Sequence, residues 1–464
     1  MSSLGAQLGH LARRLGQSHP CIPIAPERVT LLNSPVAFHD KLLNMIQNAK
    51  SRVFLSSLYL GGGAQELISS LRRGLESNSS LKVQIHLDFL RSTRPGDTES
   101  LRRLAGIVRD FPDRMTVSLF RSPKLKGLLS RVVPPRFDEG WGTWHAKMYG
   151  VDDQVLLSGA NLSKSYFTNR QDRYIHFSAA QPLADYSLAY LDGFRSLSYS
   201  LRPSDEPSGF GTSWSNQQVH PQHIEDDLRS HLTSLRRDFQ QKYEALGENS
   251  DTCLIPSAQA GYASVRDEEQ VVQALIEHAE RNSTDVDLTS GYFGLYKGYQ
   301  QLILNGQANC RIVAAGPLAN GFYGSSGVSG HIPTGYTLLE QRFWRKLRAA
   351  GRAWTGSKGV RLYEWHKPDW TYHAKGIWLS PAGSSLPYGT LFGSTNLSSR
   401  SAHLDTELSF VLLTGDEPLR ASLRDEISRM HTASTQVDEQ TWATQDRAVG
   451  LKTKLLVALF GEML

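Results

Sequence analysis

The sequence is poor in cysteine and has no long apolar run. Its three cysteines, Cys21, Cys253 and Cys310, lie far apart, so they form neither a disulfide framework nor the paired spacing of a structural zinc site. So few cysteines favour a reducing compartment. No stretch of about 18 or more apolar residues occurs, which excludes a polytopic membrane protein.

Neither sign of charge dominates the sequence. Lys and Arg total 50 and Asp and Glu total 45, and the net charge of +5 permits an anionic partner without requiring nucleic acid. Hydrophobic residues make up 40% and charged residues 20%, as in globular proteins, which excludes a disordered chain or a coiled coil. The length of 464 residues predicts two or three domains, or one duplicated fold.

Acidic residues are absent from the first 26 positions. This stretch contains Arg13 and Arg14, and apolar residues recur there at helical spacing: Leu4, Leu8, Leu11 and Leu15. A basic, amphipathic and acid-free start is typical of a mitochondrial transit peptide. A disordered terminus is the alternative interpretation of the same pattern.

An internal repeat organises the chain. Val53–Leu60 resembles Val286–Phe293, and both segments have the pattern of a strand entering a Gly-containing turn. Further strands are expected at 82–87 and 116–120 with helices near 64–77 and 98–111, and again at 311–315 and 360–365 with helices near 295–306 and 337–350. The alternation predicts an α/β fold with two α/β/α sandwich halves, mostly parallel sheets and a pseudo-twofold between them.

A polar stretch separates the two copies. Ser200–His223 is rich in Ser, Pro, Gly and Gln and predicts a linker, and an apolar stripe from Ile224 to Leu246 predicts a packing helix. The expected division is 1–26 as a transit segment, 27–200 as the first domain, 201–256 as linker and helix, 257–435 as the second domain and 436–464 as an amphipathic helix. That last helix suits a membrane interface, a core position or a dimer contact, so a homo-oligomer remains open.

Each copy carries the same set of polar residues. The first contains His145, Lys147 and Asn161 followed by Asp172, and the second contains His373, Lys375 and Asn396 followed by Glu407. In both copies the carboxylate lies eleven residues after the asparagine. One His-x-Lys pair is more often a solvated strand edge, but two matched sets predict one site between the halves.

The geometry of a strand explains this spacing. Residues two apart on a strand point to the same face, so an imidazole and an ammonium can converge on one phosphate. Asn161 and Asn396 can donate amide hydrogens to the phosphate oxygens, and Asp172 and Glu407 can accept the second ring N–H of the histidines. One histidine would attack phosphorus while the other protonates the leaving oxygen and then deprotonates the acceptor.

This chemistry requires no metal cofactor. Lys147, Lys375 and the two asparagines can neutralise the equatorial oxygens, which is the role of a metal ion elsewhere. Stimulation by a divalent cation remains open.

The first motif, His145-x-Lys147-x4-Asp152, resembles the HKD motif of the phospholipase D superfamily. Ser380 takes the place of the aspartate in the second copy, and in that superfamily the aspartate is mainly structural. The resemblance implies two phospholipase D-like halves with the active site between them. The catalytic set that it implies is His145, Lys147, Asp152, His373, Lys375, Asp172 and Glu407, with His145 as nucleophile, although the two histidines could exchange roles.

Longer segments are similar to the eukaryotic mitochondrial phosphatidylglycerophosphate synthases. They are Pro123–Leu129, Pro134–Phe137, His145–Asp153, Ala319–Phe322 and Tyr372–Trp378. The similarity implies transfer of a phosphatidyl group from CDP-diacylglycerol to glycerol 3-phosphate, the committed step toward cardiolipin. It also implies a peripheral position on the matrix side of the mitochondrial inner membrane.

The first copy contains an insertion. Phe120 and His145 are 25 residues apart, whereas only eight residues separate Trp365 from His373. The insertion mixes apolar residues with Lys124, Lys126 and Arg136, a pattern that favours contact with an anionic lipid surface over an ordinary surface loop.

The Gly- and Ser-rich segment 319–330 is a second candidate for substrate binding. It could hold phosphate oxygens at its backbone, or it could be a linking loop. The expected substrate-binding residues are Asn161, Asn396, Asn320, Lys124, Lys126, Arg136 and Arg342.

Two other functions compete with the transferase. The first is a phosphodiesterase of the same superfamily, acting on nucleic acid or phospholipid. The chain would then resemble tyrosyl-DNA phosphodiesterase, a family that also lacks the motif aspartate, as this chain does at Ser380. It would need a basic channel with stacking aromatics, and the mild net charge argues against nucleic acid as a partner. A scaffold that only binds phospholipid would not need both His-x-Lys pairs and both carboxylates.

Overall fold

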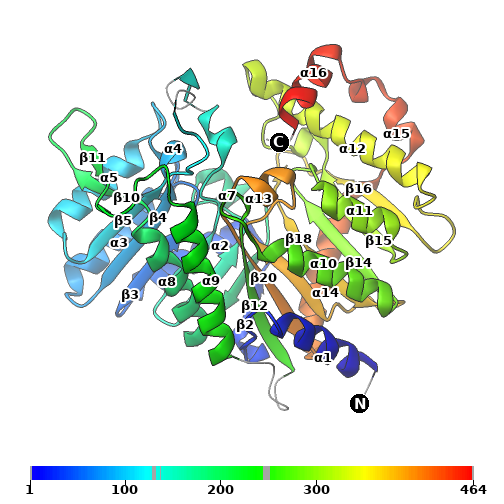
Figure 1. Ribbon diagram of the computed structural model, residues 1–464, viewed down its shortest axis with the longest axis horizontal. Helices are drawn as coiled ribbons and strands as arrows, with labels where there is room; N and C mark the ends of the chain where they lie inside the picture. The colour runs from blue at the N-terminus through cyan, green and yellow to red at the C-terminus, as the bar shows by residue number, and fades with distance from the viewer. Residues whose placement is uncertain (1–2, 128–131, 136, 244–250, 462–464) are drawn as a thin grey trace.

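The computed structural model describes residues 3–127, 132–135, 137–243 and 251–461. Two halves lie side by side, each built on one large sheet with helices packed on its faces (Figure 1). The α/β class and the duplication predicted from the sequence are confirmed.

The first half contains a nine-stranded sheet in the order β11-β10-β5-β4-β3-β6-β7-β9-β2. Its strands are β2 (Val29–Leu32), β3 (Arg52–Ser56), β4 (Lys82–Asp88), β5 (Met115–Phe120), β6 (Met148–Val151), β7 (Gln154–Ser158), β9 (Tyr174–Phe177), β10 (Tyr199–Pro203) and β11 (Phe210–Ser213). Its helices are α2 (Pro35–Gln47), α3 (Gln65–Ser77), α4 (Phe89–Ser92), α5 (Glu99–Asp110), α7 (Lys164–Thr168), α8 (Gln181–Arg195) and α9 (Glu225–Lys242).

The second half contains a ten-stranded sheet in the order β1-β12-β20-β19-β18-β14-β15-β16-β21, with β13 paired to β12. Its strands are β1 (Ile22–Pro23), β12 (Thr252–Ala260), β13 (Val265–Arg266), β14 (Thr284–Ser290), β15 (Cys310–Ala315), β16 (Val360–Trp365), β18 (Lys375–Pro381), β19 (Gly389–Gly393), β20 (Glu407–Thr414) and β21 (Ser434–Gln436). Its helices are α1 (Ser3–Gly16), α10 (Asp267–Arg281), α11 (Lys297–Asn305), α12 (Ile332–Ala349), α13 (Ser399–His403), α14 (Glu417–Thr432), α15 (Glu439–Ala443) and α16 (Leu451–Phe460).

Both sheets are mixed, which corrects the expectation of mostly parallel sheets. Within the two large sheets, the described strands that pair in parallel are those of the repeated β-α-β-α-β unit: β3 pairs with β4 and β4 with β5, as β14 pairs with β15 and β15 with β16. The chain then returns on the other side of the first strand as an antiparallel hairpin, β6–β7 or β18–β19. This hairpin follows the His-x-Lys motif in both halves, and it cannot be parallel because its connection is too short for a crossover.

The stretch Ser200–His223 is only partly a linker. Its first residues lie in β10, and β11 follows within it; both strands extend the first sheet beyond β5. Solvated edge strands lack a clear apolar alternation, and for this reason the pattern of this stretch predicts a polar linker instead of strands. The packing helix is confirmed as α9, whose Leu228, Leu232 and Leu235 are buried against the first half.

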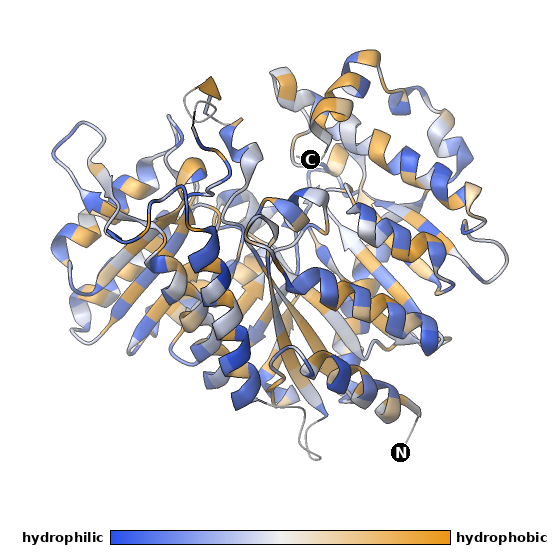
Figure 2. Ribbon diagram, in the orientation of Figure 1, coloured by the Kyte–Doolittle hydropathy of each residue, from blue (hydrophilic) through white to orange (hydrophobic). Residues whose placement is uncertain are grey.

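The apolar core is continuous across the boundary between the halves. Figure 2 shows hydrophobic residues along the central strands of both sheets. The rings of Phe177 on β9 and Phe392 on β19 stack with centroids 6.4 Å apart and belong to one buried cluster. The two halves are therefore fixed relative to each other by shared packing.

Helix α1 is part of the second half. It packs against α10, and Leu8, Leu11 and Leu15 are buried in the core of that half, while β1 pairs with β12. The alternative of a disordered terminus is therefore wrong, and packing accounts for the helical spacing of these leucines. A transit role for residues 1–26 stays a prediction.

Truncation of Leu11 tests this packing. Leu11 is fully buried, so we expect Leu11→Ala to lower the free energy of unfolding by about 2–5 kcal/mol, measured by urea denaturation. Arg13→Ala changes an exposed residue of the same helix and should cost less than about 0.5 kcal/mol. Equal stabilities for the Leu11 variant and the wild type would show that α1 does not pack as described.

Candidate active site

Two short ladders join the halves and place the histidines. β17 (Thr371–Tyr372) pairs with β8 (Arg170–Gln171), and the His373 backbone N–H donates to the Gln171 carbonyl at 2.8 Å. In the matching ladder, the His145 backbone N–H donates to the Thr406 carbonyl at 2.9 Å. Gln171 precedes Asp172 and Thr406 precedes Glu407, so each ladder sets the histidine of one half beside the carboxylate of the other.

The two acids therefore exchange partners between halves. Nδ1 of His145 lies 2.9 Å from Oε2 of Glu407, and Nδ1 of His373 lies 2.6 Å from Oδ2 of Asp172. All four side chains are buried. A carboxylate that accepts the Nδ1 proton fixes the tautomer and leaves Nε2 for a reacting group.

Each lysine contacts the histidine of its own motif. Nζ of Lys147 donates to the carbonyl of His145 at 2.7 Å. Nζ of Lys375 lies 2.6 Å from Nδ1 of His373 and 3.4 Å from Oδ2 of Asp172. Burial lowers the pKa of Lys147 to about 7 although Glu407 opposes the shift, and burial also lowers the pKa of Lys375.

Burial controls the protonation of the site. It lowers the pKa of His145, with Glu407 opposing the shift, and together with Lys375 it takes the pKa of His373 well below its usual value. Burial also acts to raise the pKa of Glu407, but His145 and Lys147 outweigh it and hold that pKa at about 2. Near neutral pH the His145–Glu407 pair is thus a neutral imidazole on an ionised carboxylate, the form that can attack phosphorus.

The asparagines are held differently in the two halves. Nδ2 of Asn161 donates to the Tyr166 hydroxyl at 3.1 Å, and that hydroxyl lies 3.3 Å from Nε2 of His373. Oδ1 of Asn396 is buried and, within the described residues, has no hydrogen-bond partner. Both asparagines line the same cavity as the two histidines.

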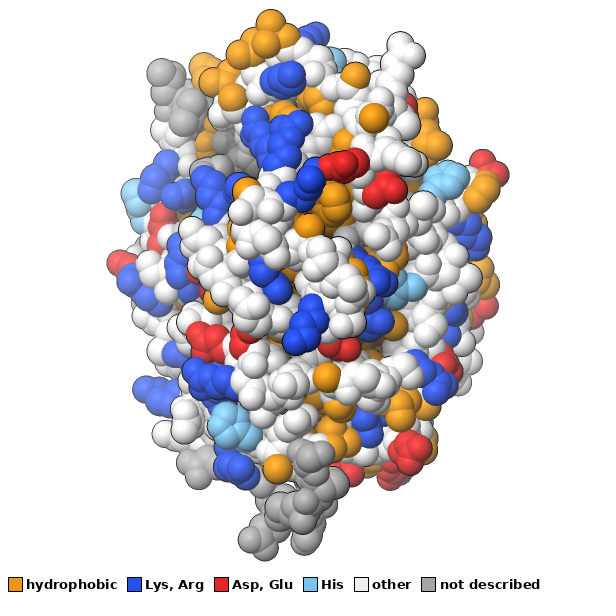
Figure 3. Space-filling view, turned by 90° about the vertical axis from the view of Figure 1, so that its right-hand side faces the viewer, with side chains coloured by type: hydrophobic (Ala, Val, Ile, Leu, Met, Phe, Trp, Pro, Cys, Tyr) orange, Lys and Arg blue, Asp and Glu red, His pale blue; other side chains and the backbone are white. Residues whose placement is uncertain are grey.

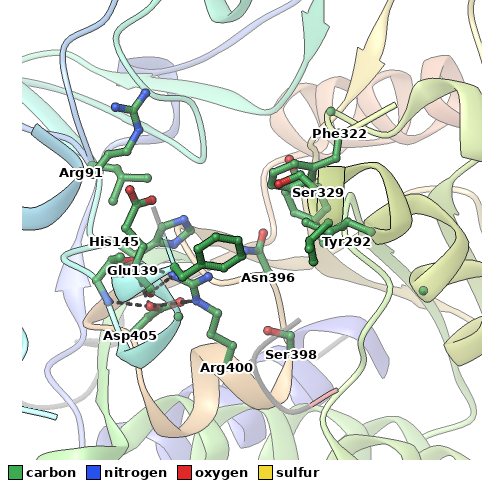
Figure 4. A pocket seen from close by; sticks show the side chains of 18 of the residues that line it. Arg91, Glu139, His145, Tyr292, Phe322, Ser329, Asn396, Ser398, Arg400 and Asp405 are labelled. Carbon is green, nitrogen blue, oxygen red and sulfur yellow. Dashed lines mark hydrogen bonds and ion pairs between the residues drawn. The ribbon is translucent and has the colours of Figure 1, made fainter. Parts of the chain in front are cut away.

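That cavity has a volume of about 770 Å³ and lies between the halves. In Figure 4, Arg91, Glu139 and His145 lie on one side, and Tyr292, Phe322 and Ser329 lie on the other. Part of the lining is apolar and includes Val132, Val133, Pro134, Phe137, Val328, Leu456 and Val457. A polar, reactive region that continues into an apolar one suits an amphiphilic substrate.

The structure does not bring Asp152 to this cavity, which corrects its place in the catalytic set. Asp152 has a φ of 54° and accepts hydrogen bonds from the backbone N–H groups of Lys50, Ser51 and Arg52. These contacts tie the turn after β6 to the start of β3. Asp152 is structural, and a serine at the matching position 380 removes no reacting group.

Several expected substrate-binding residues also lie elsewhere. Lys124, Lys126 and Arg342 are exposed and do not line the cavity, and Lys126 lies 3.5 Å from Glu225. Oδ1 of Asn320 accepts the backbone N–H of Phe322 and closes a turn. The prediction for Arg136 lies outside the described residues. Sequence alone could not separate these residues from the site because all are polar residues near reactive segments.

Two further carboxylates support the histidine segment. Asp405 accepts the backbone N–H of Thr143 at 2.8 Å and is paired with Arg400. Asp88 accepts the backbone N–H of Trp144 at 2.8 Å, and burial raises its pKa to about 8. Asp405 lies two residues before Glu407, which is a signal in the sequence, whereas nothing in the sequence pattern marked Asp88.

In the part of the chain that the structure describes, no group of three or more His, Cys, Asp or Glu side chains could hold a metal ion. The prediction that no metal is needed is not tested by this observation.

Comparison with known proteins first supports the fold. No family model matches the sequence. The phosphatidylserine synthase of Haemophilus influenzae superposes with a TM-score of 0.72 at 20% identity, over 97% of both chains. The duplicated fold and the paired His-x-Lys motifs define a phospholipase D-like protein.

Curated relatives give the family. The human mitochondrial CDP-diacylglycerol–glycerol-3-phosphate 3-phosphatidyltransferase is 35% identical, over 95% of this chain and 84% of the relative. The Schizosaccharomyces pombe enzyme of that name is 32% identical, over 87% and 89%, and a probable Dictyostelium discoideum enzyme is 32% identical, over 98% and 81%. The chain belongs to the CDP-diacylglycerol–glycerol-3-phosphate 3-phosphatidyltransferase family.

The contact between His145 and Glu407 of the other half can be tested by the pH dependence of activity. The carboxylate of Glu407 favours the protonated imidazole, so Glu407→Gln should lower the pKa of His145 further and move the acidic limb of kcat/KM to lower pH. Activity at the optimum should also fall by about 10²–10⁴-fold because the ring loses its orienting acid. The measurement is a pH–rate profile, with Glu99→Gln, an exposed site, as the matched control. An acidic limb that stays in place would contradict the pairing.

Proposed function

We propose that this chain transfers the phosphatidyl group of CDP-diacylglycerol to sn-glycerol 3-phosphate, giving phosphatidylglycerophosphate and CMP through a phospho-histidine intermediate. The observation that carries the proposal is the pair of buried imidazoles that share one cavity, each on a carboxylate from the opposite half. The names of relatives matched over more than four fifths of their length support the substrates.

In the first step, Nε2 of His145 attacks the phosphorus that bears diacylglycerol. The P–O bond to CMP breaks, and His373 gives its Nε2 proton to the departing oxygen. Asp172 stabilises the imidazolium that this role requires, and the anionic diphosphate raises the proton affinity of the ring as it binds. CMP leaves, and the phosphatidyl group stays on His145.

In the second step, glycerol 3-phosphate enters on the side of His373. The ring takes the proton from the attacking hydroxyl, the new P–O bond forms and the P–N bond to His145 breaks. Lys147, Lys375, Asn161 and Asn396 neutralise the phosphoryl oxygens, so the reaction proceeds without a metal cofactor. The same site with water as acceptor would be a phosphodiesterase.

We also place the protein on a lipid surface, at the matrix side of the mitochondrial inner membrane. Most of the exposed large apolar residues belong to segments that border the cavity: Val132, Phe137, Leu318, Tyr323, Val328, Leu451, Leu455 and Leu459. On α16, Lys452 and Lys454 are exposed beside the leucines. Figure 3 shows apolar side chains at the top of the molecule next to Lys and Arg.

This arrangement supports interfacial contact with anionic lipid, because leucines can enter the acyl region while lysines meet headgroups. Among the described residues, no helix is both long enough and apolar enough to cross a bilayer. The relatives' mitochondrial names support the compartment.

Trapping tests the covalent step. With CDP-diacylglycerol labelled in the phosphatidyl group, His373→Ala should retain label on the protein. Loss of the acid slows formation of the intermediate, but CMP is a good leaving group, whereas the acceptor hydroxyl cannot resolve the intermediate without a base. His145→Ala should retain none. Label on neither variant, together with residual transfer activity, would contradict the proposal, and label on His145→Ala alone would exchange the roles of the histidines.

The acceptor assay tests the reaction itself. We expect CMP release to require glycerol 3-phosphate, with at most a few per cent of that rate when serine, phosphatidylglycerol or water is offered. EDTA should leave the rate unchanged. Release at the same rate with water alone would instead define a phosphodiesterase, and loss of activity in EDTA would overturn the metal-independent step.

Vesicle binding tests the lipid surface. The double variant Leu455→Glu, Leu459→Glu should bind vesicles of phosphatidylcholine and phosphatidylglycerol about tenfold or more weakly. Insertion of the two exposed leucines into the acyl region of the bilayer contributes about 1.4 kcal/mol or more to binding. Val36→Glu is the matched control, since Val36 is 52% exposed but lies on α2, away from the cavity. Equal binding by the double variant, or equal loss in the control, would contradict the contact through α16.

A further inference from the structure

Among the described residues, four arginines line the active-site cavity, and carboxylates neutralise three of these four. Arg91 lies 2.8 Å from Asp97 and Arg400 lies 2.9 Å from Asp405. Arg94 is paired with Glu139. Among the described residues no ion pair joins the fourth, Arg170, to a carboxylate.

Arg170 is held by neutral groups instead. Its Nε donates to Oγ1 of Thr371 at 3.0 Å, and its guanidinium lies 4.5 Å from the centre of the Tyr166 ring. An arginine guanidinium carries its charge at every relevant pH. A fixed, half-buried cation without a counter-ion in a substrate cavity is suited to an anion from the substrate.

A glycine lets the backbone at position 321 approach this guanidinium closely. A Cβ atom at Gly321 would lie 3.1 Å from Nη2 of Arg170 and 2.9 Å from the Tyr292 hydroxyl. Gly321 and Phe322 both line the cavity and belong to the Gly- and Ser-rich segment 319–330. A larger residue at 321 would crowd the guanidinium and the Tyr292 hydroxyl on the face that lines the cavity.

Arg170 belongs to the His373 side of the cavity. Its neighbour Gln171 accepts the backbone N–H of His373, and the charge of Arg170 helps to lower the pKa of that ring, after burial and Lys375. Tyr166 contacts both residues: its ring lies under the guanidinium and its hydroxyl is 3.3 Å from Nε2 of His373. In the proposed reaction, this is the side on which CMP leaves and the acceptor enters.

We propose that Arg170, which the small residue Gly321 leaves uncrowded in the cavity, forms the subsite for the phosphate monoester of the acceptor. This inference rests on the proposed function and extends it to acceptor selection. An acceptor that carries a phosphate supplies the missing counter-ion, whereas glycerol or serine would leave the guanidinium desolvated and unpaired. Sites built for a polar group reject ligands that lack it by large factors. CMP is also a phosphate monoester, and the experiment separates it from the acceptor.

Steady-state kinetics with Arg170→Gln test the subsite. At saturating CDP-diacylglycerol, we expect the KM for glycerol 3-phosphate to rise about tenfold or more, as for loss of a charge-assisted hydrogen bond, with kcat changed less than about threefold. Arg170→Lys should recover part of the loss. The KM for CDP-diacylglycerol and the inhibition constant of CMP should stay within about twofold of wild type.

Arg91→Gln is the matched control, because Arg91 also lines the cavity and lies 3.8 Å from the centre of the Tyr59 ring, but it is paired with Asp97. Its KM for glycerol 3-phosphate should stay within about twofold of wild type. Thermal unfolding checks that each variant is folded.

An unchanged KM for glycerol 3-phosphate in Arg170→Gln would overturn the inference and leave the proposed function standing. A rise confined to the KM for CDP-diacylglycerol or to the CMP inhibition constant would also overturn it, since the subsite would then hold the nucleotide. Wild-type protein that releases CMP without regard to glycerol 3-phosphate would overturn the proposed function instead.

Discussion

Everything reactive in this structure depends on two imidazole–carboxylate pairs that cross the boundary between the halves. Each His-x-Lys motif supplies a ring, but the acid that orients the ring comes from the other half, brought there by a short backbone ladder. Neither half alone contains a complete catalytic pair. The shared apolar packing around Phe177 and Phe392 is therefore a requirement of catalysis as well as of stability.

The pseudo-symmetry is strict at this centre and relaxed away from it. The histidine–carboxylate pairs match between halves, whereas the lysines and the asparagines differ in their contacts and Asp152 has only Ser380 as its counterpart. The insertion, the Gly- and Ser-rich segment and α16 make the cavity asymmetric. Replacing one group on phosphorus by another needs both a symmetric pair of histidines and an asymmetric cavity. The histidines act on the phosphoryl group in either step, and the surrounding cavity distinguishes the lipid from the acceptor.

The local architecture could be predicted from the sequence, and the long-range pairing could not. The repeated strands and helices could be predicted because apolar periodicity and Gly-containing turns are local signals. The helices and strands α3, β4, α5 and β16 lie within a few residues of their expected positions. Spacing showed that Asp172 and Glu407 belong to the site, but only the fold reveals the exchange of partners. The sequence does not predict β10 and β11, because solvated edge strands lack a clear apolar alternation. It does not single out Arg170 either, because the absence of a counter-ion is a property of the assembled cavity.

The exchange of partners is tested most directly by nitrogen NMR of the histidine side chains in protein labelled at its imidazoles. Replacing Glu407 by glutamine should move the titration and tautomer signals of His145 and leave those of His373 in place, while Asp172→Asn should do the reverse. If each substitution instead perturbs the histidine of its own half, the two halves do not share one catalytic centre in the way described.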